Sequence, residues 1–148
     1  MKNFKLGLVA LAIIAFAGAV NAGGVGYIDY AKVIDNYDYA KQVTKEIDAK
    51  GLEMQQYLVD KEKEYKSLDT PLKRQTFEER ISQEFKQKES AYMALKEKRF
   101  REVDGKIKEA AKAVMVEQKL DAVMDSAGVF VGGVDITPSV ISKLKLMK

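Results

Sequence analysis

The fold is decided around residues 67–73, SLDTPLK, where a long helical pattern turns back on itself. From about Tyr30 to Gln118 the chain contains one proline and two glycines, and apolar side chains recur at three- and four-residue steps on both sides of this turn. Thr70 offers a hydroxyl that can cap a helix, and Pro71 suits a first helical position, where its missing amide hydrogen costs nothing. The sequence therefore predicts an antiparallel hairpin of two long helices.

The polar faces of these helices carry acidic residues four positions before basic ones, each such pair contributing about 0.2 to 0.5 kcal/mol. The pairs are Glu46 with Lys50, Glu62 with Lys66, Glu84 with Lys88, Glu97 with Arg101, Glu102 with Lys106 and Asp104 with Lys108. Gly51 and Gly105 lie inside the helices, where each costs roughly 1 kcal/mol relative to alanine. One interpretation is that solvated helices tolerate them, and the alternative is that they are points of flexure.

The first residues are typical of a secretory signal peptide. Lys2 and Lys5 precede an uncharged apolar run from Leu6 to Val20, and small residues follow up to Ala22. The run is shorter than the roughly twenty residues of a membrane anchor, so we expect cleavage after Ala22 and export. Without residues 1–22 the chain keeps 23 of its 25 basic residues against 22 acidic ones, a net charge of +1.

Short strands are predicted at both ends of the chain. They cover Gly24–Asp29, Leu120–Asp125 and Val129–Val131, the last two joined through residues 126–128, and a helix is expected from Pro138 to about Leu146. Asp29 can cap the following helix, and Asp38 can cap a fresh start after a break at residues 35–38. Three strands this short make a poor independent sheet, and the chain has no cysteine for a disulfide. We therefore expect a homo-oligomer, which would complete the sheet and enlarge a small core.

This order of segments resembles the Skp/OmpH family of periplasmic chaperones. The resemblance covers Gly24 to the C-terminus, and its most specific parts are Val25–Asp29, Asp135–Thr137 and Val140–Ile141. It implies an α+β, mostly α fold, in which a helical-hairpin arm is rooted in a small β body completed by trimerisation. The expected division is a signal peptide at 1–22, a discontinuous trimerisation body at 23–45 and 105–148, and the arm at 46–104.

The resemblance also implies a function and partners. Family members hold unfolded outer-membrane β-barrel proteins in a cavity between three arms, in the periplasm and without ATP. The expected oligomerisation residues are Val25, Tyr27, Ile28, Val123, Met124, Val129, Phe130 and Val131. Family members are often clearly basic, whereas residues 40–118 here hold 18 basic and 16 acidic side chains, which weakens the case for lipopolysaccharide or a membrane surface as a partner.

The residue types argue against an enzyme. The chain has no histidine, cysteine or tryptophan, which removes the usual general base, thiol nucleophile and soft metal ligands. No phosphate-binding loop motif is present, and we expect no cofactor and no metal. Acidic residues interleave with the basic cluster at residues 96–101, so we expect a solvated helix face and no nucleic-acid binding.

Apolar residues away from the helical seam are the candidate client-binding residues. At 100° per residue, Leu52 and Val59 share one line on the first helix, as do Met93 and Phe100 on the second, and Tyr57 lies to one side. Isolated surface apolar residues need no special role; the functional interpretation is that these five line a cavity wall. The alternative to a chaperone is a structural coiled-coil spacer of the cell envelope.

Overall fold

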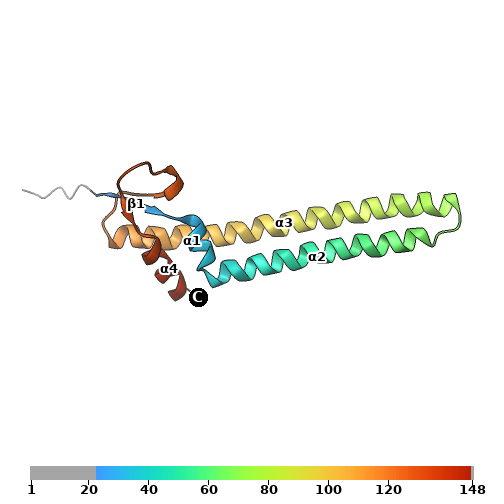
Figure 1. Cartoon of the computed structure of the whole chain (residues 1–148), viewed down its shortest axis with the longest axis horizontal. Helices are drawn as coiled ribbons and strands as arrows, with labels where there is room; N and C mark the ends of the chain where they lie inside the picture. Colours follow the sequence, from blue (N-terminus) through green and yellow to red (C-terminus); the bar gives the residue numbers. More distant parts are fainter. Residues whose placement is uncertain (1–22, 148) are drawn as a thin grey trace, which may run out of the picture.

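The computed structural model describes residues 23–147, so the expected signal peptide lies outside the described residues. Two long helices, α2 (Asp38–Lys66) and α3 (Pro71–Glu117), run side by side and project from a small body at one end (Figure 1). The connection is the predicted one, with Thr70 Oγ1 accepting from the Lys73 amide at 3.3 Å and Pro71 opening α3. The predicted hairpin is confirmed, as is the mostly helical α+β class.

The body contains a three-stranded parallel sheet with the order β2-β1-β3. The strands are β1 (Val25–Ile28), β2 (Ala122–Asp125) and β3 (Val134–Asp135), and a 3-10 turn, η1 (Ser126–Gly128), follows β2. The central strand β1 therefore comes from the N-terminal end of the described chain and both neighbours come from the C-terminal end. This arrangement ties the two ends of the chain together at the root of the hairpin.

The predicted strand at Val129–Val131 is wrong for the single chain. Both edges of β1 are already occupied, by β2 and by β3, which begins at Val134. Gly132 and Gly133, at φ +82° and +88°, turn the chain into β3 in a conformation that favours glycine. The segment 129–131 therefore forms part of a loop that leads from one edge of the sheet to the other.

Two short helices complete the body, α1 (Tyr30–Asp35) and α4 (Thr137–Leu146). The Asp29 carboxylate caps α1 as predicted, accepting from the Lys32 amide at 3.0 Å, and the Asp29 amide donates to Thr137 Oγ1 at 2.9 Å. The break before α2 is present, but Asp38 is the first helical residue, preceded by Tyr37 at the cap position. The expected cap at Asp38 is therefore shifted by one residue, which leaves its carboxylate in the first turn, where the helix dipole favours a negative charge.

One apolar core joins the body to the root of the arm. Its fully buried members include Val33 of α1, Val103, Ile107 and Val114 of α3, and Val140 of α4. Along the arm the seam is thinner, and burial is partial from Met54 outwards until Phe77 near the tip. The body is therefore the best-packed part of the chain, and the arm extends from it as a two-helix rod.

Candidate binding surfaces

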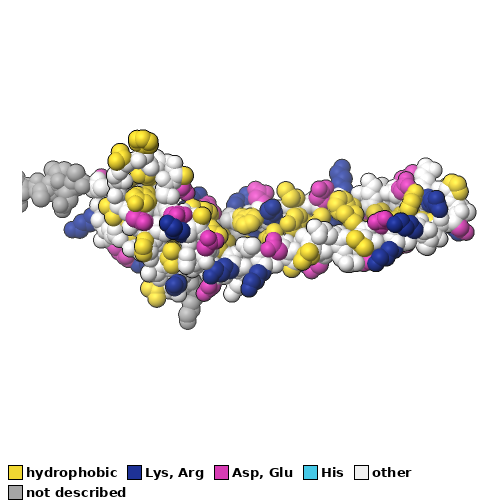
Figure 2. Space-filling view, viewed as in Figure 1, with side chains coloured by type: hydrophobic (Ala, Val, Ile, Leu, Met, Phe, Trp, Pro, Cys, Tyr) yellow, Lys and Arg dark blue, Asp and Glu magenta, His cyan; other side chains and the backbone are white. Residues whose placement is uncertain are grey.

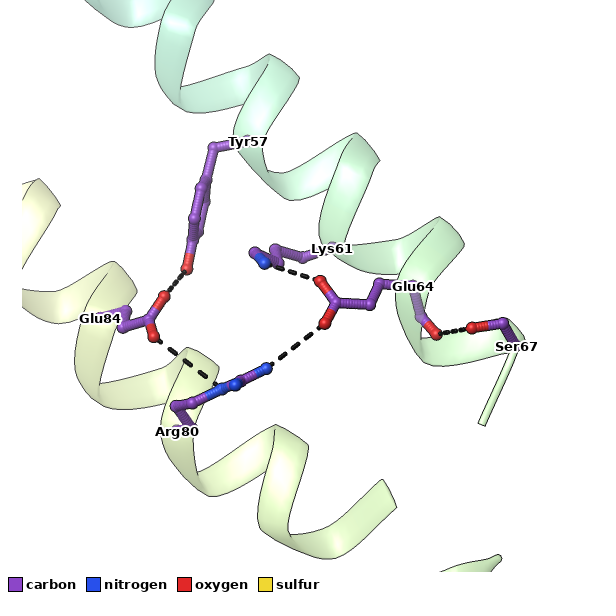
Figure 3. A network of polar contacts seen from close by, with 6 residues as sticks. All are labelled: Tyr57, Lys61, Glu64, Ser67, Arg80 and Glu84. Carbon is purple, nitrogen blue, oxygen red and sulfur yellow. Dashed lines mark hydrogen bonds and ion pairs between the residues drawn. The ribbon is translucent and has the colours of Figure 1, made fainter. Parts of the chain in front are cut away.

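A network of charged and phenolic groups joins the two helices in the outer part of the arm, towards its tip (Figure 3). The Tyr57 hydroxyl of α2 donates to Glu84 of α3 at 2.7 Å. Arg80 of α3 lies 3.4 Å from Glu64, which also accepts from Lys61 at 2.6 Å. Desolvation and the bond to Glu84 raise the pKa of Tyr57 to about 12. Within this network, Lys61 occupies a position where the helical stripe would otherwise carry an apolar side chain.

A second network lies at the root of the arm. Arg99 of α3 lies 3.1 Å from Glu46 of α2 and 3.0 Å from Glu102 of α3. Glu102 also accepts from the Tyr39 hydroxyl at 2.9 Å, and these donors hold its pKa below the ordinary value, Arg99 being the larger cause. Polar contacts across the seam thus replace apolar packing at two levels of the arm.

Tyr57 lies in the seam between α2 and α3. Lys61 and Lys88 lie over its ring, 5.7 Å and 4.9 Å from the centroid, and its hydroxyl is engaged by Glu84. The structure therefore places Tyr57 between the two helices of its own arm and apart from the other four candidate client-binding residues.

Met93 and Phe100 lie together on one flank of α3. They line a groove of about 520 Å³ with Tyr30, Lys96, Glu97, Arg101 and Asp104. Met93 is 56% exposed and Phe100 is 44% exposed. The carboxylates at the rim are paired within α3, Glu97 with Arg101 at 3.2 Å and Asp104 with Lys108 at 2.7 Å. An apolar side chain could enter this groove without desolvating an unpaired carboxylate.

Leu52 and Val59 lie on the other helix and are 65% and 46% exposed. Neither lines the groove that contains Met93 and Phe100. At 100° per residue they point nearly opposite to Val43, Ile47 and Met54, which face α3, and hydrophobic side chains alternate with charges along the arm (Figure 2). The structure therefore separates the other four expected cavity-wall residues into two surfaces.

A second groove continues this flank into the body. It has a volume of about 360 Å³ and lies between β2 and α3, where its apolar members include Ile107, Ala111, Met115, Val123 and Met124. Tyr30 and Asp104 line both grooves, so the two are contiguous. Tyr30 had no predicted role; its signal in the sequence is an aromatic residue directly after the helix-capping Asp29.

The expected oligomerisation residues differ in their accessibility. Ile28 is only 8% exposed and belongs to the core of its own chain, which leaves little of it for a partner to contact. Tyr27, Val123 and Val129 are half-buried, and the most exposed members are Val25 at 40%, Met124 at 46%, Val131 at 86% and Phe130 at 102%. Among the expected oligomerisation residues, the exposed surface thus lies mainly on the loop that follows β2, with smaller contributions from Val25 of β1 and Met124 of β2.

Among residues 23–147 no cluster of acidic, histidine or cysteine side chains could hold a metal ion. No helix of the described chain combines the length and the apolar character needed to cross a membrane.

A family model described as outer membrane protein (OmpH-like) matches residues 24–144. The chain belongs to this OmpH-like family. This confirms the resemblance found in the sequence. A solved structure from Caulobacter crescentus, described as an OmpH-like outer membrane chaperone, is similar at 14% identity over 85% of this chain and 86% of that one, with a TM-score of 0.42. No curated protein matches the chain significantly.

Proposed function

We propose that this OmpH-like chain is an ATP-independent holdase chaperone of the periplasm, which binds unfolded outer-membrane β-barrel proteins and prevents their aggregation. The observation that carries the proposal is the groove at Met93 and Phe100, an exposed apolar site on a long arm whose two carboxylates, Glu97 and Asp104, are already paired. Family membership supports the same role, and the signal peptide expected at residues 1–22 would deliver the chain to the periplasm.

The arms act together in this proposal. Three chains associate through the exposed residues of β1, β2 and the following loop, and their arms surround the client. Methionine and phenylalanine suit contact with varied apolar segments, because a thioether adapts its shape and an aromatic ring offers a large surface. Each contact is weak, and several arms binding one chain raise the overall affinity by avidity. A client can then leave one contact at a time, which requires no ATP.

Aggregation of a urea-denatured outer-membrane β-barrel protein, diluted into buffer and followed by light scattering, tests the proposal. Residues 23–148 should suppress the scattering near one trimer per client, and native mass spectrometry should show one client per trimer. A chain that leaves the scattering unchanged would contradict the chaperone role and favour the structural spacer.

Two matched variants identify the binding surface. Met93→Ser with Phe100→Ser removes the groove residues, whereas Leu52→Ser with Val59→Ser removes two apolar residues of similar exposure on the other helix. If all four contact the client, each double variant should weaken retention on a sizing column. If only the groove does, the second variant should match the wild-type chain. Retention that both double variants leave intact would show that neither surface binds the client.

A further inference from the structure

A third groove lies between the two helices of the arm, on the body side of the network in Figure 3. Each helix lines it with residues at positions i, i+3, i+4 and i+7, which share one helix face. These positions run from Lys50 to Tyr57 on α2 and from Lys88 to Leu95 on α3. The volume of this inter-helix groove is about 220 Å³, and a cavity of roughly 150 Å³ can hold benzene. The groove therefore has room for one aromatic ring with a short substituent.

The interior of the inter-helix groove is apolar and aromatic. Met54 of α2 and Leu95 of α3 are half-buried in it, and Ala91 contributes only a methyl group. Each helix adds one aromatic ring to the lining, Tyr57 from α2 and Tyr92 from α3. A thioether and two aromatic rings make favourable contacts with a further aromatic ring. These residue types favour an aromatic ligand.

The charges of the lining favour an anion. Lys50 pairs with Glu53 at 2.7 Å, so these two charges offset each other. Lys88 lies over the Tyr57 ring, 4.9 Å from its centroid, and forms no ion pair with a carboxylate of residues 23–147. Glu84, four positions before Lys88, accepts from the Tyr57 hydroxyl instead. The groove thus presents one uncompensated cation beside an apolar interior.

We propose that the inter-helix groove binds a small aromatic carboxylate, with its ring among Met54, Tyr57 and Tyr92 and its carboxylate towards Lys88. This goes beyond the chaperone role, because the ligand is a small molecule held within one arm. Both helices line the groove, so a bound acid connects α2 to α3. Binding to the folded arm alone also stabilises it by mass action.

Nuclear magnetic resonance of residues 23–148, labelled at the methionine methyl groups, tests the proposal. Met54 lines the inter-helix groove, whereas Met93 lines a different groove and serves as an internal control. Titration with 3-phenylpropanoate should shift the Met54 signal to saturation, with a Kd of about 1 mM or lower, and leave the Met93 signal in place. The neutral analogue 3-phenylpropanamide should bind about 3- to 10-fold more weakly, because it forms no ion pair with Lys88.

Two pairs of matched variants locate the site. Lys88→Gln should remove the preference for the acid over the amide, whereas Lys86→Gln, at an exposed position outside the groove, should retain it. Ala91→Phe should fill the groove and abolish binding of both ligands. Ala94→Phe is its control, because Ala94 is also exposed but does not line the groove. Circular dichroism checks that each variant keeps the helical content of the wild-type chain.

Three outcomes would overturn the proposal. The first is a Met54 signal that the acid does not shift to saturation at about tenfold the expected Kd. The second is equal affinity for the acid and the amide, which would show that Lys88 does not select an anion. The third is binding that survives Ala91→Phe, which would place the ligand elsewhere. None of these measurements requires a client, so failure of the chaperone assay would leave them interpretable.

Discussion

The guanidinium of Arg99 on α3 lies 3.1 Å from the carboxylate of Glu46 on α2, 53 residues away in the chain. The same guanidinium contacts Glu102 at 3.0 Å, so one cation holds two carboxylates at the root of the arm. These neighbours raise the pKa of Arg99 further above its ordinary value, Glu102 being the larger cause. Arg99 therefore offsets the repulsion between the Glu46 and Glu102 carboxylates in the seam.

Replacing this cation should loosen the arm. We expect Arg99→Met to lower the Tm measured by far-ultraviolet circular dichroism, because Glu46 and Glu102 are left without their shared partner. Adding Glu46→Gln should restore part of the loss, since it removes one of the two like charges. Arg101→Met is the control, because its partner Glu97 lies four residues away on an exposed face, where ion pairs contribute little. Equal losses for Arg99→Met and Arg101→Met would contradict a special role for Arg99.

Acid should weaken the same network. Arg99 and Tyr39 hold the folded pKa of Glu102 below 4.5, its ordinary value. A depressed carboxyl pKa contributes stability that is fully present above 4.5 and is lost as the pH falls through the folded pKa. The difference in Tm between the wild-type chain and Glu102→Gln should therefore be constant from about pH 7 to pH 5 and shrink below 4.5. A difference that stays constant down to about pH 3 would contradict this linkage.

The Tyr57 hydroxyl should lose its proton only at unusually high pH. Its pKa is about 12 when folded, compared with 10 when unfolded, so the stability it contributes is present below pH 10 and is lost as the pH rises towards 12. Absorbance at the tyrosinate band should show a component near pH 12 that is missing in Tyr57→Phe. Glu84→Gln should move this component to lower pH, because it removes the negative charge that accepts the phenolic hydrogen bond. A titration that Tyr57→Phe leaves unchanged above pH 11 would show that another group is responsible.

The helical elements could be predicted because their signals are local. Residues 67–73 hold the capping hydroxyl and the proline that end one helix and begin the next, and both act as expected in the structure. Residues at the three- and four-residue steps of the apolar pattern, among them Val43, Ile47, Val103 and Ile107, are buried in the core. Contacts between residues three or four positions apart, or within one turn, require no knowledge of the rest of the fold.

Contacts between distant segments were harder to predict. Of the six expected ion pairs, Glu62 with Lys66, Glu97 with Arg101 and Asp104 with Lys108 are formed. In the other three, the acidic residue has other partners: Glu46 meets Arg99 of the opposite helix, Glu84 accepts from Tyr57 of the opposite helix, and Glu102 contacts Arg99 of its own helix and Tyr39 of the opposite one. A four-residue spacing identifies a pair only when no other donor competes for the carboxylate. For the same reason the pattern at Val129–Val131 predicted a strand but could not indicate whether a partner exists.

Packing at the root of the arm should dominate stability. Ile107 is 1% exposed and lies within the core shared by the arm and the body. Ile107→Ala should therefore lower the free energy of unfolding, measured with urea, by about 2 to 5 kcal/mol. Leu58→Ala is the control, since Leu58 is 43% exposed and its truncation should cost much less. Ile107→Val should fall between the two, at about 0.5 to 1.5 kcal/mol. Similar losses of unfolding free energy for Ile107→Ala and Leu58→Ala would contradict a core centred on the root of the arm.

The two glycines of the arm test whether it bends. A Cβ at Gly105 would meet nothing within 4 Å, and a Cβ at Gly51 would come no closer than 3.6 Å to the Tyr92 hydroxyl, so alanine fits at both sites. Each substitution should add about 0.5 to 1 kcal/mol to helix stability by restricting the backbone. If the glycines are flexure points, the double variant should also narrow the distribution of distances between the arms of the proposed oligomer.

Pulsed electron resonance can measure those distances, with a spin label on Leu72→Cys at each tip and no native cysteine to interfere. Gln55→Ala is the control, because it changes an exposed helical side chain without altering backbone freedom. Narrower distributions for Gly51→Ala with Gly105→Ala, but not for Gln55→Ala, would show that the arms open and close at the glycines. Unchanged distributions together with a higher Tm would mean that the glycines only weaken the helices, and that any movement of the arms arises where they join the body.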